Sequence, residues 1–205
     1  MTIAVQFHFD FGSPNAYLCH KVLPALAQRT GTTVQYVPVL LGGVFKLANN
    51  RAPGETNAQI PNKRAYDLLE MKRFIAKHQL VAFKANPFFP VNTLAIMRTA
   101  VAAEVAGCFA NYVEVVFAAM WEQGRNMADA AEIVAVLDAA GLDGKALLEG
   151  AVNPDVKAKL MANTQNSYER GAFGSPTFFV GSEMYFGKDR LPDVEMEILR
   201  QLRLA

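Results

Sequence analysis

The fold of this 205-residue chain is decided near its N-terminus by the stretch Phe7-His8-Phe9-Asp10-Phe11-Gly12-Ser13-Pro14-Asn15-Ala16-Tyr17-Leu18. Residues 3–9 are mostly apolar or aromatic, which is typical of a buried strand. Residues 10–12 form a short turn, and Ser13-Pro14 then begins a helix, with serine at the N-cap and proline at the first helical position. Apolar residues at helical spacing continue to about Arg29. The stretch therefore predicts a strand, a tight turn and a helix with a hydroxyl at its N-terminal end, which forms the mouth of the helix.

The mouth of this helix can stabilise a negative charge. A helix N-terminus presents free N–H donors and a partial positive charge, and it lowers the pKa of a thiol held there. The Ser13 hydroxyl can donate to such a thiolate, but serine has no sulfur, so the thiol has to come from a ligand. The alternative is that Ser13 is an ordinary N-cap, and only the rest of the chain favours one interpretation over the other.

Composition excludes several classes of function. The 52% apolar content is enough for the core of one domain, with or without an insertion. A net charge of +1 with no basic stripe argues against nucleic acid, and the longest apolar run, residues 115–121, is too short to span a membrane. No signal peptide is predicted, and Cys19 and Cys108 are isolated, so a reduced, cytoplasmic setting is expected. The three histidines lack metal-ligand spacing, so no metal is expected.

The order of the remaining elements defines the architecture. Residues 32–39 read as a second strand, which makes a βαβ unit with parallel pairing, and Pro38 marks a strand end or edge. The strand signal then disappears until residues 176–180 and 184–186, which read as a hairpin before a turn at 187–190 and a last helix at 191–204. A short helix or turn at 42–48 and a polar loop at 49–61 precede helices at 62–79, 91–106, 110–123, 129–140, 144–150 and 154–170.

The helix expected at 62–79 carries a clear apolar stripe. The side chains expected to face the core are those of Ala65, Leu68, Leu69, Met71, Phe74 and Ile75. Taken together, the element order predicts an α/β fold, a thioredoxin-like fold with a large all-helical insertion. The thioredoxin-like domain would comprise residues 1–40 and 172–205, and the helical insertion domain residues 41–171.

Four motifs carry a resemblance to a known family. They are Phe9-Asp10-Phe11-Gly12-Ser13-Pro14-Asn15-Ala16-Tyr17, Asn86-Pro87, Phe173-Gly174-Ser175-Pro176-Thr177 and Phe186-Gly187-Lys188-Asp189-Arg190. With these motifs the chain resembles, from end to end, the 2-hydroxychromene-2-carboxylate isomerase family. That family belongs to the glutathione-dependent branch of the thioredoxin superfamily that also holds DsbA and the kappa-class glutathione transferases.

The resemblance implies a cofactor site for glutathione. It makes Ser13 the catalytic residue that holds the glutathione thiol as a thiolate. It makes Pro176 a cis-proline facing the helix mouth, preceded by Ser175, whose backbone would pair with the tripeptide. Asp189 would bind the γ-glutamyl ammonium, although a helix-capping role is equally ordinary for it. For Pro176, an ordinary proline at a strand entry is the less favoured alternative. Further cofactor-binding residues implied nearby are Phe186, Gly187 and Lys188.

The resemblance also implies a site for a small aromatic carboxylate. Lys46 would lie by the substrate carboxylate, although an exposed lysine is usually only solvated. The other substrate-binding residues implied are Asn57, Asn86 and Pro87. The sequence departs from the family at Ala58, where the isomerases commonly have arginine, and at Ser175, where many members have a branched apolar residue.

The function implied is glutathione-dependent interconversion of 2-hydroxychromene-2-carboxylate and trans-o-hydroxybenzylidenepyruvate, or close analogues, in aromatic-compound catabolism. A homodimer is expected on the same ground. The alternatives are a kappa-class-like glutathione transferase and a non-catalytic module that binds glutathione or a peptide. Disulfide exchange is the least favoured, because Ser13-Pro14-Asn15-Ala16 contains no cysteine.

Overall fold

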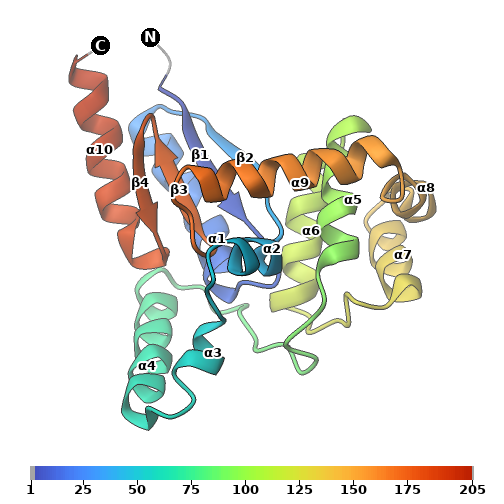
Figure 1. Cartoon of the computed structure of the whole chain (residues 1–205), viewed down its shortest axis with the longest axis horizontal. Helices are drawn as coiled ribbons and strands as arrows, with labels where there is room; N and C mark the ends of the chain where they lie inside the picture. The colour runs from blue at the N-terminus through green and yellow to red at the C-terminus, as the bar shows by residue number, and fades with distance from the viewer. Residues whose placement is uncertain (1–2, 205) are drawn as a thin grey trace.

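A mixed four-stranded sheet of order β2-β1-β3-β4 forms the centre of the molecule (Figure 1). The computed structural model describes residues 3–204. Strand β1 (Val5–Phe9) pairs in parallel with β2 (Val34–Pro38) and antiparallel with β3 (Thr177–Val180), which pairs antiparallel with β4 (Glu183–Phe186). Pro38 ends the edge strand β2, where its missing N–H is tolerated. The parallel βαβ unit and the C-terminal hairpin are thus confirmed.

Helix α1 (Pro14–Thr30) begins and ends as its sequence predicts. Ser13 is the N-cap, with φ −93° and ψ 113°, and its Oγ accepts a hydrogen bond from the Ala16 N–H at 3.2 Å. Pro14 occupies the first turn, and Gly31 ends the helix in the left-handed region at φ 64°. Local capping chemistry therefore fixes where the mouth of α1 lies.

The two faces of the sheet are covered by different helices. Phe7 and Phe9 of β1 point to one face, where Phe9 packs on Phe117 of α6 (Phe109–Trp121). On the opposite face His8 meets Ser167 of α9 (Pro154–Glu169), which crosses in front of the sheet in Figure 1. The alternation along β1 thus buries aromatic rings on one side and an imidazole on the other.

The chain between β2 and β3 supplies the helices of the thioredoxin-like fold's insertion. The described residues contain no strand between Pro38 and Thr177. Besides α6 and α9, the helices there are α2 (Leu41–Leu47), α3 (Pro53–Thr56), α4 (Pro61–Lys77), α5 (Leu94–Val105), α7 (Ala130–Ala139) and α8 (Gly144–Gly150). A 3₁₀ turn, η1 (Lys188–Arg190), leads into α10 (Leu191–Leu204). The fold class is confirmed, whereas the domain boundaries near residues 40 and 172 stay a prediction.

The segment from α3 to α4 differs from the sequence-based expectation. The polar stretch 49–61, expected as a loop, contains the short helix α3. The helix expected at 62–79 forms as α4, but Leu68 and Leu69 are 54% and 42% exposed and Ala65 is also exposed. Of the α4 residues, Phe74 is buried and Met71 and Ile75 are half-buried. The prediction of an inward face was wrong for Ala65, Leu68 and Leu69, because α3 and α4 extend away from the body of the molecule (Figure 1).

Within residues 3–204, every helix is too short or too polar to cross a lipid bilayer.

Candidate active site at the mouth of helix α1

Ser13 and Ser175 meet at the mouth of α1. The Ser13 Oγ donates a hydrogen bond to the Ser175 carbonyl oxygen at 2.9 Å while it accepts the bond from Ala16. The peptide bond between Ser175 and Pro176 is cis, in agreement with the expectation for Pro176. The structure therefore places Ser13, Ser175 and Pro176 together although 162 residues separate the two serines.

Asp10 holds the turn that carries Ser13. Its side chain is fully buried, and its two carboxylate oxygens accept hydrogen bonds from Gly12 N at 2.8 Å, Leu41 N at 2.8 Å and Thr93 Oγ1 at 3.1 Å. Burial raises the pKa of this carboxyl group, and the bonds from Leu41, Gly12 and Thr93 offset only part of that rise. Two of these donors are backbone N–H groups, which can only donate, so the arrangement suits a carboxylate.

Sequence reasoning assigned Asp10 only to a turn. An aspartate that ends a buried strand two residues before a glycine N–H is the usual signal for an Asx turn, and the bond from Gly12 N is of that kind. No local signal indicates the bonds from Leu41 and Thr93, because these residues lie far along the chain.

Ser175 uses its side chain as well as its carbonyl. The Ser175 Oγ accepts a hydrogen bond from the Asp10 backbone N–H at 3.1 Å, so the loop before Pro176 is tied twice to the β1–α1 turn. A branched apolar residue at this position could not accept that bond. The departure from the family pattern at Ser175 thus has a structural consequence, which is a more firmly anchored loop.

Two predicted cofactor residues extend the site along the cis-proline loop. The Gly187 N–H donates to the Pro176 carbonyl oxygen at 3.0 Å, and Gly187 has φ 94°, a backbone conformation that favours glycine. The Phe186 ring centre lies 4.4 Å from that of Phe173, with the two rings tilted, and the ring covers Gly174, where an added Cβ would lie 2.8 Å from the Phe186 ring. Glycine at position 174 therefore allows the ring to lie against the loop.

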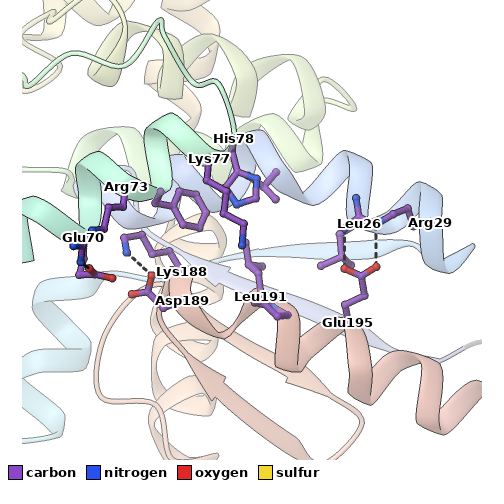
Figure 2. A pocket seen from close by; sticks show the side chains of 13 residues that line it. Leu26, Arg29, Glu70, Arg73, Lys77, His78, Lys188, Asp189, Leu191 and Glu195 are labelled. Carbon is purple, nitrogen blue, oxygen red and sulfur yellow. Dashed lines mark hydrogen bonds and ion pairs between the residues drawn. The ribbon is translucent and has the colours of Figure 1, made fainter.

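Lys188 and Asp189 lie in a groove of about 370 Å³ between α1, α4 and the start of α10 (Figure 2). The Lys188 ammonium is buried, donates to the Asp189 carboxylate and lies 5.2 Å from the centre of the Phe74 ring. The Asp189 side chain is 60% exposed. The neighbouring α10 begins at Leu191, and the bond that Asp189 accepts comes from Lys188 rather than from a helix N–H. Asp189 thus presents an accessible carboxylate.

The groove also contains cations from α1 and α4. Arg29 is paired with Glu195 of α10 through two hydrogen bonds of 2.9 and 2.7 Å, and Arg73 is paired with Glu70. Lys77 lines the same groove, as Figure 2 shows. The groove therefore carries both signs of charge, as a site for a zwitterionic group would.

The predicted substrate residues are dispersed. Lys46 lies exposed on α2, and among residues 3–204 its side chain makes no hydrogen bond or ion pair. Asn57 is buried and donates to the Asp67 carboxylate at 3.0 Å, which joins α3 to α4. No hydrogen bond within the described part of the chain links either residue to Ser13, so a shared role in substrate binding stays a prediction.

Asn86 is committed to holding its own loop. Its Nδ2 donates to the carbonyl oxygens of Met120 and Arg125, both at 2.9 Å, and its Oδ1 accepts from Phe88 N at 2.8 Å. Both amide hydrogens are thus used, and Asn86 fixes the loop that presents Pro87 and the exposed Phe88. A direct substrate contact by Asn86 or Pro87 stays a prediction.

An aromatic cluster beside this loop was missed from the sequence. The Trp121 Nε1 donates to the Phe11 carbonyl oxygen at 2.8 Å, in the same turn as Ser13. The Trp121 ring lies 6.1 Å from that of Phe83 and 5.8 Å from that of Phe89, which is 54% exposed. The rigid segment 86–90 was recognised in the sequence, but its contact with Trp121 depends on long-range packing. A flat apolar ligand near the turn would find aromatic partners here.

No cysteine lies at the mouth of α1. Cys19 is fully buried within α1, and burial raises the pKa of its thiol, so it is not a nucleophile. Cys108 is half-buried and unpaired. Within residues 3–204 no three side chains are arranged to hold a metal ion. The mouth of α1 therefore offers a hydroxyl, backbone groups and a helix N-terminus to a ligand.

Comparison with known proteins gives one consistent result. Residues 4–199 match the model of the DSBA-like thioredoxin domain. The chain is 29% identical to a 2-hydroxychromene-2-carboxylate isomerase of Sphingobium xenophagum, over 97% of this chain and 100% of the relative. It is 30% identical to an isomerase of the same name from Pseudomonas putida, over 97% and 96%.

A solved structure and a more distant relative are also similar to this chain over most of its length. A solved 2-hydroxychromene-2-carboxylate isomerase superposes with a TM-score of 0.80 at 28% identity and covers 98% of this chain and 97% of its own. Glutathione S-transferase kappa 1 of Caenorhabditis elegans is 27% identical over 91% of this chain and 86% of the relative.

Proposed function

We propose that this chain is a glutathione-dependent isomerase, on the premise that it belongs to the DSBA-like thioredoxin domain family and, within it, to the 2-hydroxychromene-2-carboxylate isomerases. Its reaction would interconvert 2-hydroxychromene-2-carboxylate and trans-o-hydroxybenzylidenepyruvate, or close analogues, in the breakdown of aromatic compounds. The observation that carries the proposal is the Ser13 hydroxyl at the mouth of α1, bonded to the Ser175 carbonyl oxygen where no cysteine is present.

The residues at the mouth suit glutathione. Ser175 offers a carbonyl oxygen with a second lone pair, and the Ser175–Pro176 loop is firmly held by Asp10. The exposed Asp189 carboxylate suits an ammonium group, with Lys188, Gly187 and Phe186 around it. When bound, glutathione supplies a thiolate nucleophile that adds reversibly to a conjugated substrate, so that a bond can rotate before the thiol leaves.

Each residue of the proposed site has its own task. When the sulfur is bound, the Ser13 O–H would turn from the Ser175 carbonyl oxygen to the sulfur and so favour the thiolate over the thiol. The N-terminus of α1 adds a partial positive charge at the same place. Lys46 on α2 offsets the charge of the substrate carboxylate, and the exposed ring of Phe89, which lies on Trp121, packs against its aromatic part. The groove at Lys188 and Asp189 receives the γ-glutamyl end.

The proposal is tested with purified protein and trans-o-hydroxybenzylidenepyruvate. The expected result is a change of substrate absorbance that requires glutathione and leaves the total thiol unchanged. Calorimetry should show glutathione binding, and Asp189→Asn should weaken that binding without altering the fold. Absence of binding at millimolar glutathione overturns the proposal.

A kappa-class-like glutathione transferase is the second candidate, supported by the 27% identity to a kappa transferase. The same residues at the mouth would serve it, but the thioether would then be the product. Incubation with 1-chloro-2,4-dinitrobenzene separates the two, because a transferase consumes one thiol per turnover. Binding of glutathione without turnover of either compound would instead indicate a non-catalytic binding module.

A homodimer is part of the proposal. The apolar side chains of α4 and the segment before it support it, because Ile60, Tyr66, Leu68 and Leu69 are exposed. A cluster of this kind on one projecting segment is typical of a protein–protein contact.

A further inference from the structure

Asp10 connects four separate segments around Ser13. Its backbone carbonyl accepts from Ser13 N at 3.0 Å, and its backbone N–H donates to Ser175 Oγ at 3.1 Å. Its carboxylate reaches the first residue of α2 through Leu41 N and the residue before α5 through Thr93 Oγ1. One buried residue, through its backbone and its side chain, thus joins the turn of Ser13, the cis-proline loop and the starts of two helices.

We propose that Asp10 is a positioning residue that fixes the Ser13 hydroxyl relative to the Lys46 ammonium. The inference rests on the proposed function, in which these two groups act on the two ends of one substrate. Ser13 follows the turn that the carboxylate closes, and Lys46 lies on the helix whose first N–H the same carboxylate holds. Asp10 therefore links the turn that carries Ser13 to the start of the helix that carries Lys46.

Helix α2 depends on Asp10 for the position of its N-terminus. Its N-cap residue, Leu40, has no side-chain oxygen to accept from the first turn. The Leu40 N–H donates to Thr164 Oγ1 at 3.0 Å, and the next N–H, that of Leu41, donates to Asp10. Without Asp10 the Leu41 N–H would lose its acceptor, while the Leu40 N–H would keep its bond to Thr164.

The chemistry of the carboxylate explains why the position suits aspartate. Two backbone N–H groups approach different oxygens of the same side chain. An amide has only one oxygen, so an asparagine would face one of the two N–H groups with its own NH₂. Asp10 has no ion-pair partner within the described residues, which indicates that its acceptors serve these hydrogen bonds rather than a cation.

The turn has no space in which to adjust. A Cβ added to Gly12 would lie 3.0 Å from the Thr93 Cγ2 and 3.3 Å from the Asp10 Oδ1. Since the turn is packed directly against both side chains, a change at Asp10 is transmitted to the adjacent Ser13. The same compactness means that substitutions at Asp10 risk general destabilisation, so the sharper test removes the partner on α2.

The main test compares Leu41→Pro with Leu41→Ala. Proline lacks the N–H that donates to Asp10 but is tolerated at the first helical position, and Leu40, at φ −87° and ψ 108°, has the extended backbone required before proline. Both variants lose the leucine side chain, and only Leu41→Ala keeps the N–H. The difference between them therefore reports the single hydrogen bond to Asp10.

The readout is the effect of Lys46→Met in each background. In the wild-type chain and in Leu41→Ala, Lys46→Met should weaken binding of trans-o-hydroxybenzylidenepyruvate, measured by calorimetry without glutathione, by about tenfold. In Leu41→Pro the same substitution should weaken binding by about twofold or less, because Lys46 no longer lies at its place. The same pattern is expected in kcat/KM with glutathione present.

Asp10→Asn provides a second route, with Thr93→Val as its control. Asp10→Asn should reduce the Lys46→Met effect as Leu41→Pro does, whereas Thr93→Val, which removes one bond on the α5 side, should leave it at about tenfold. If Lys46→Met weakens carboxylate binding equally in Leu41→Pro and Leu41→Ala, the positioning role of Asp10 is wrong, whatever the melting temperatures. If the wild-type chain binds the carboxylate but shows no glutathione-dependent turnover, the proposed function fails, while the binding measurements still judge Asp10 separately.

Discussion

The mouth of helix α1 and the arm formed by α3 and α4 show opposite degrees of packing. At the mouth, Asp10, Ser13 and Ser175 are buried, and each is hydrogen-bonded through both backbone and side chain. On α4, by contrast, Phe74 is buried while Leu68 and Leu69 face solvent. The difference teaches that the groups proposed to act on the thiol lie where neighbouring segments fix them, whereas the arm is attached through few side chains and is free to meet a partner.

Helix α4 of the arm lines the groove of Figure 2 together with α1 and the start of α10. Phe74 of α4 lies over the buried ammonium of Lys188, which bonds to Asp189 of the proposed cofactor site. The arm therefore contributes one wall of that groove, although it contributes no hydrogen bond to Ser13.

Removal of the Phe74 anchor is expected to have the largest effect. Phe74→Ala deletes a buried ring and should cost about 3–5 kcal/mol of the free energy that holds α4 in place. Hydrogen exchange should show faster opening of α4 amides while those of the sheet keep their protection. Leu68→Ala, on the same helix but exposed, should change stability by less than about 0.5 kcal/mol. Equal loss of protection in the sheet and in α4 would contradict the separation of the two regions.

Acid should lower the free energy of unfolding through His8, which lies on strand β1 of the sheet and not on the arm. His8 is buried, its Nδ1 lies 3.0 Å from Ser167 Oγ, and its Nε2 has no partner within the described residues. Burial, aided by the charge of Arg170, lowers the pKa of His8 from 6.5 to about 4. The unfolded chain therefore binds a proton that the folded chain excludes.

The sign and the size of this effect follow from linkage. The contribution of His8 to stability is complete above pH 6.5 and is lost as the pH falls toward about 4. The loss amounts to at most about 3.5 kcal/mol, since each pKa unit corresponds to about 1.4 kcal/mol. Urea unfolding between pH 7.5 and 4.5 measures it, and His8→Gln, which does not titrate, should show a shallower pH dependence. Identical slopes for both proteins would rule out His8 as the source.

Loss of the Ser13 hydroxyl should reduce turnover more than stability. Ser13→Ala removes a hydrogen bond to a charged sulfur, worth roughly 1.5–3 kcal/mol, so kcat should fall by about one to two decades. The pKa of the bound thiol should rise, which lowers the thiolate absorbance near ~240 nm. Glutathione affinity should change less, because the other contacts of the peptide remain.

A matched control separates catalysis from helix capping. Asp129 caps α7, far from the proposed site, by accepting a hydrogen bond from Ala131 N at 2.8 Å. Asp129→Ala should therefore cost about 1 kcal/mol of stability and leave turnover unchanged. Ser13→Cys should lower isomerisation and allow a mixed disulfide with glutathione. If Ser13→Ala behaves like Asp129→Ala, Ser13 is an ordinary N-cap.

A charge on the arm should have the smallest effect on the folded chain. Leu69→Glu changes an exposed side chain, so unfolding stability should move by less than about 0.5 kcal/mol. If the arm forms the contact between two copies, the same substitution should shift sedimentation from dimer toward monomer. Arg64→Gln changes the net charge by the same amount without touching an apolar side chain, and it should leave the dimer intact. A dimer that survives Leu69→Glu would place the contact elsewhere.

The sequence by itself determined those features that depend on neighbours along the chain. Ser13, Pro14 and Gly31 mark the ends of α1 through capping and backbone preferences that act within one turn. The bounds of α8 and α10 agree with the periodicity residue for residue. The family resemblance carried by the motif around Ser175 and Pro176 pointed to the loop that meets Ser13, and the antiparallel pairing of β1 and β3 places both at one end of the sheet.

Only the tertiary structure decided which apolar faces are buried and which polar groups are bonded. The stripe on α4 has the helical spacing of a core face, yet Leu68 and Leu69 are exposed because no other element packs on them. The carboxylate of Asp10 meets Leu41 and Thr93, which lie 31 and 83 residues away. Periodicity and capping are local effects, whereas burial and buried hydrogen bonds require a partner that the chain supplies only after it has folded.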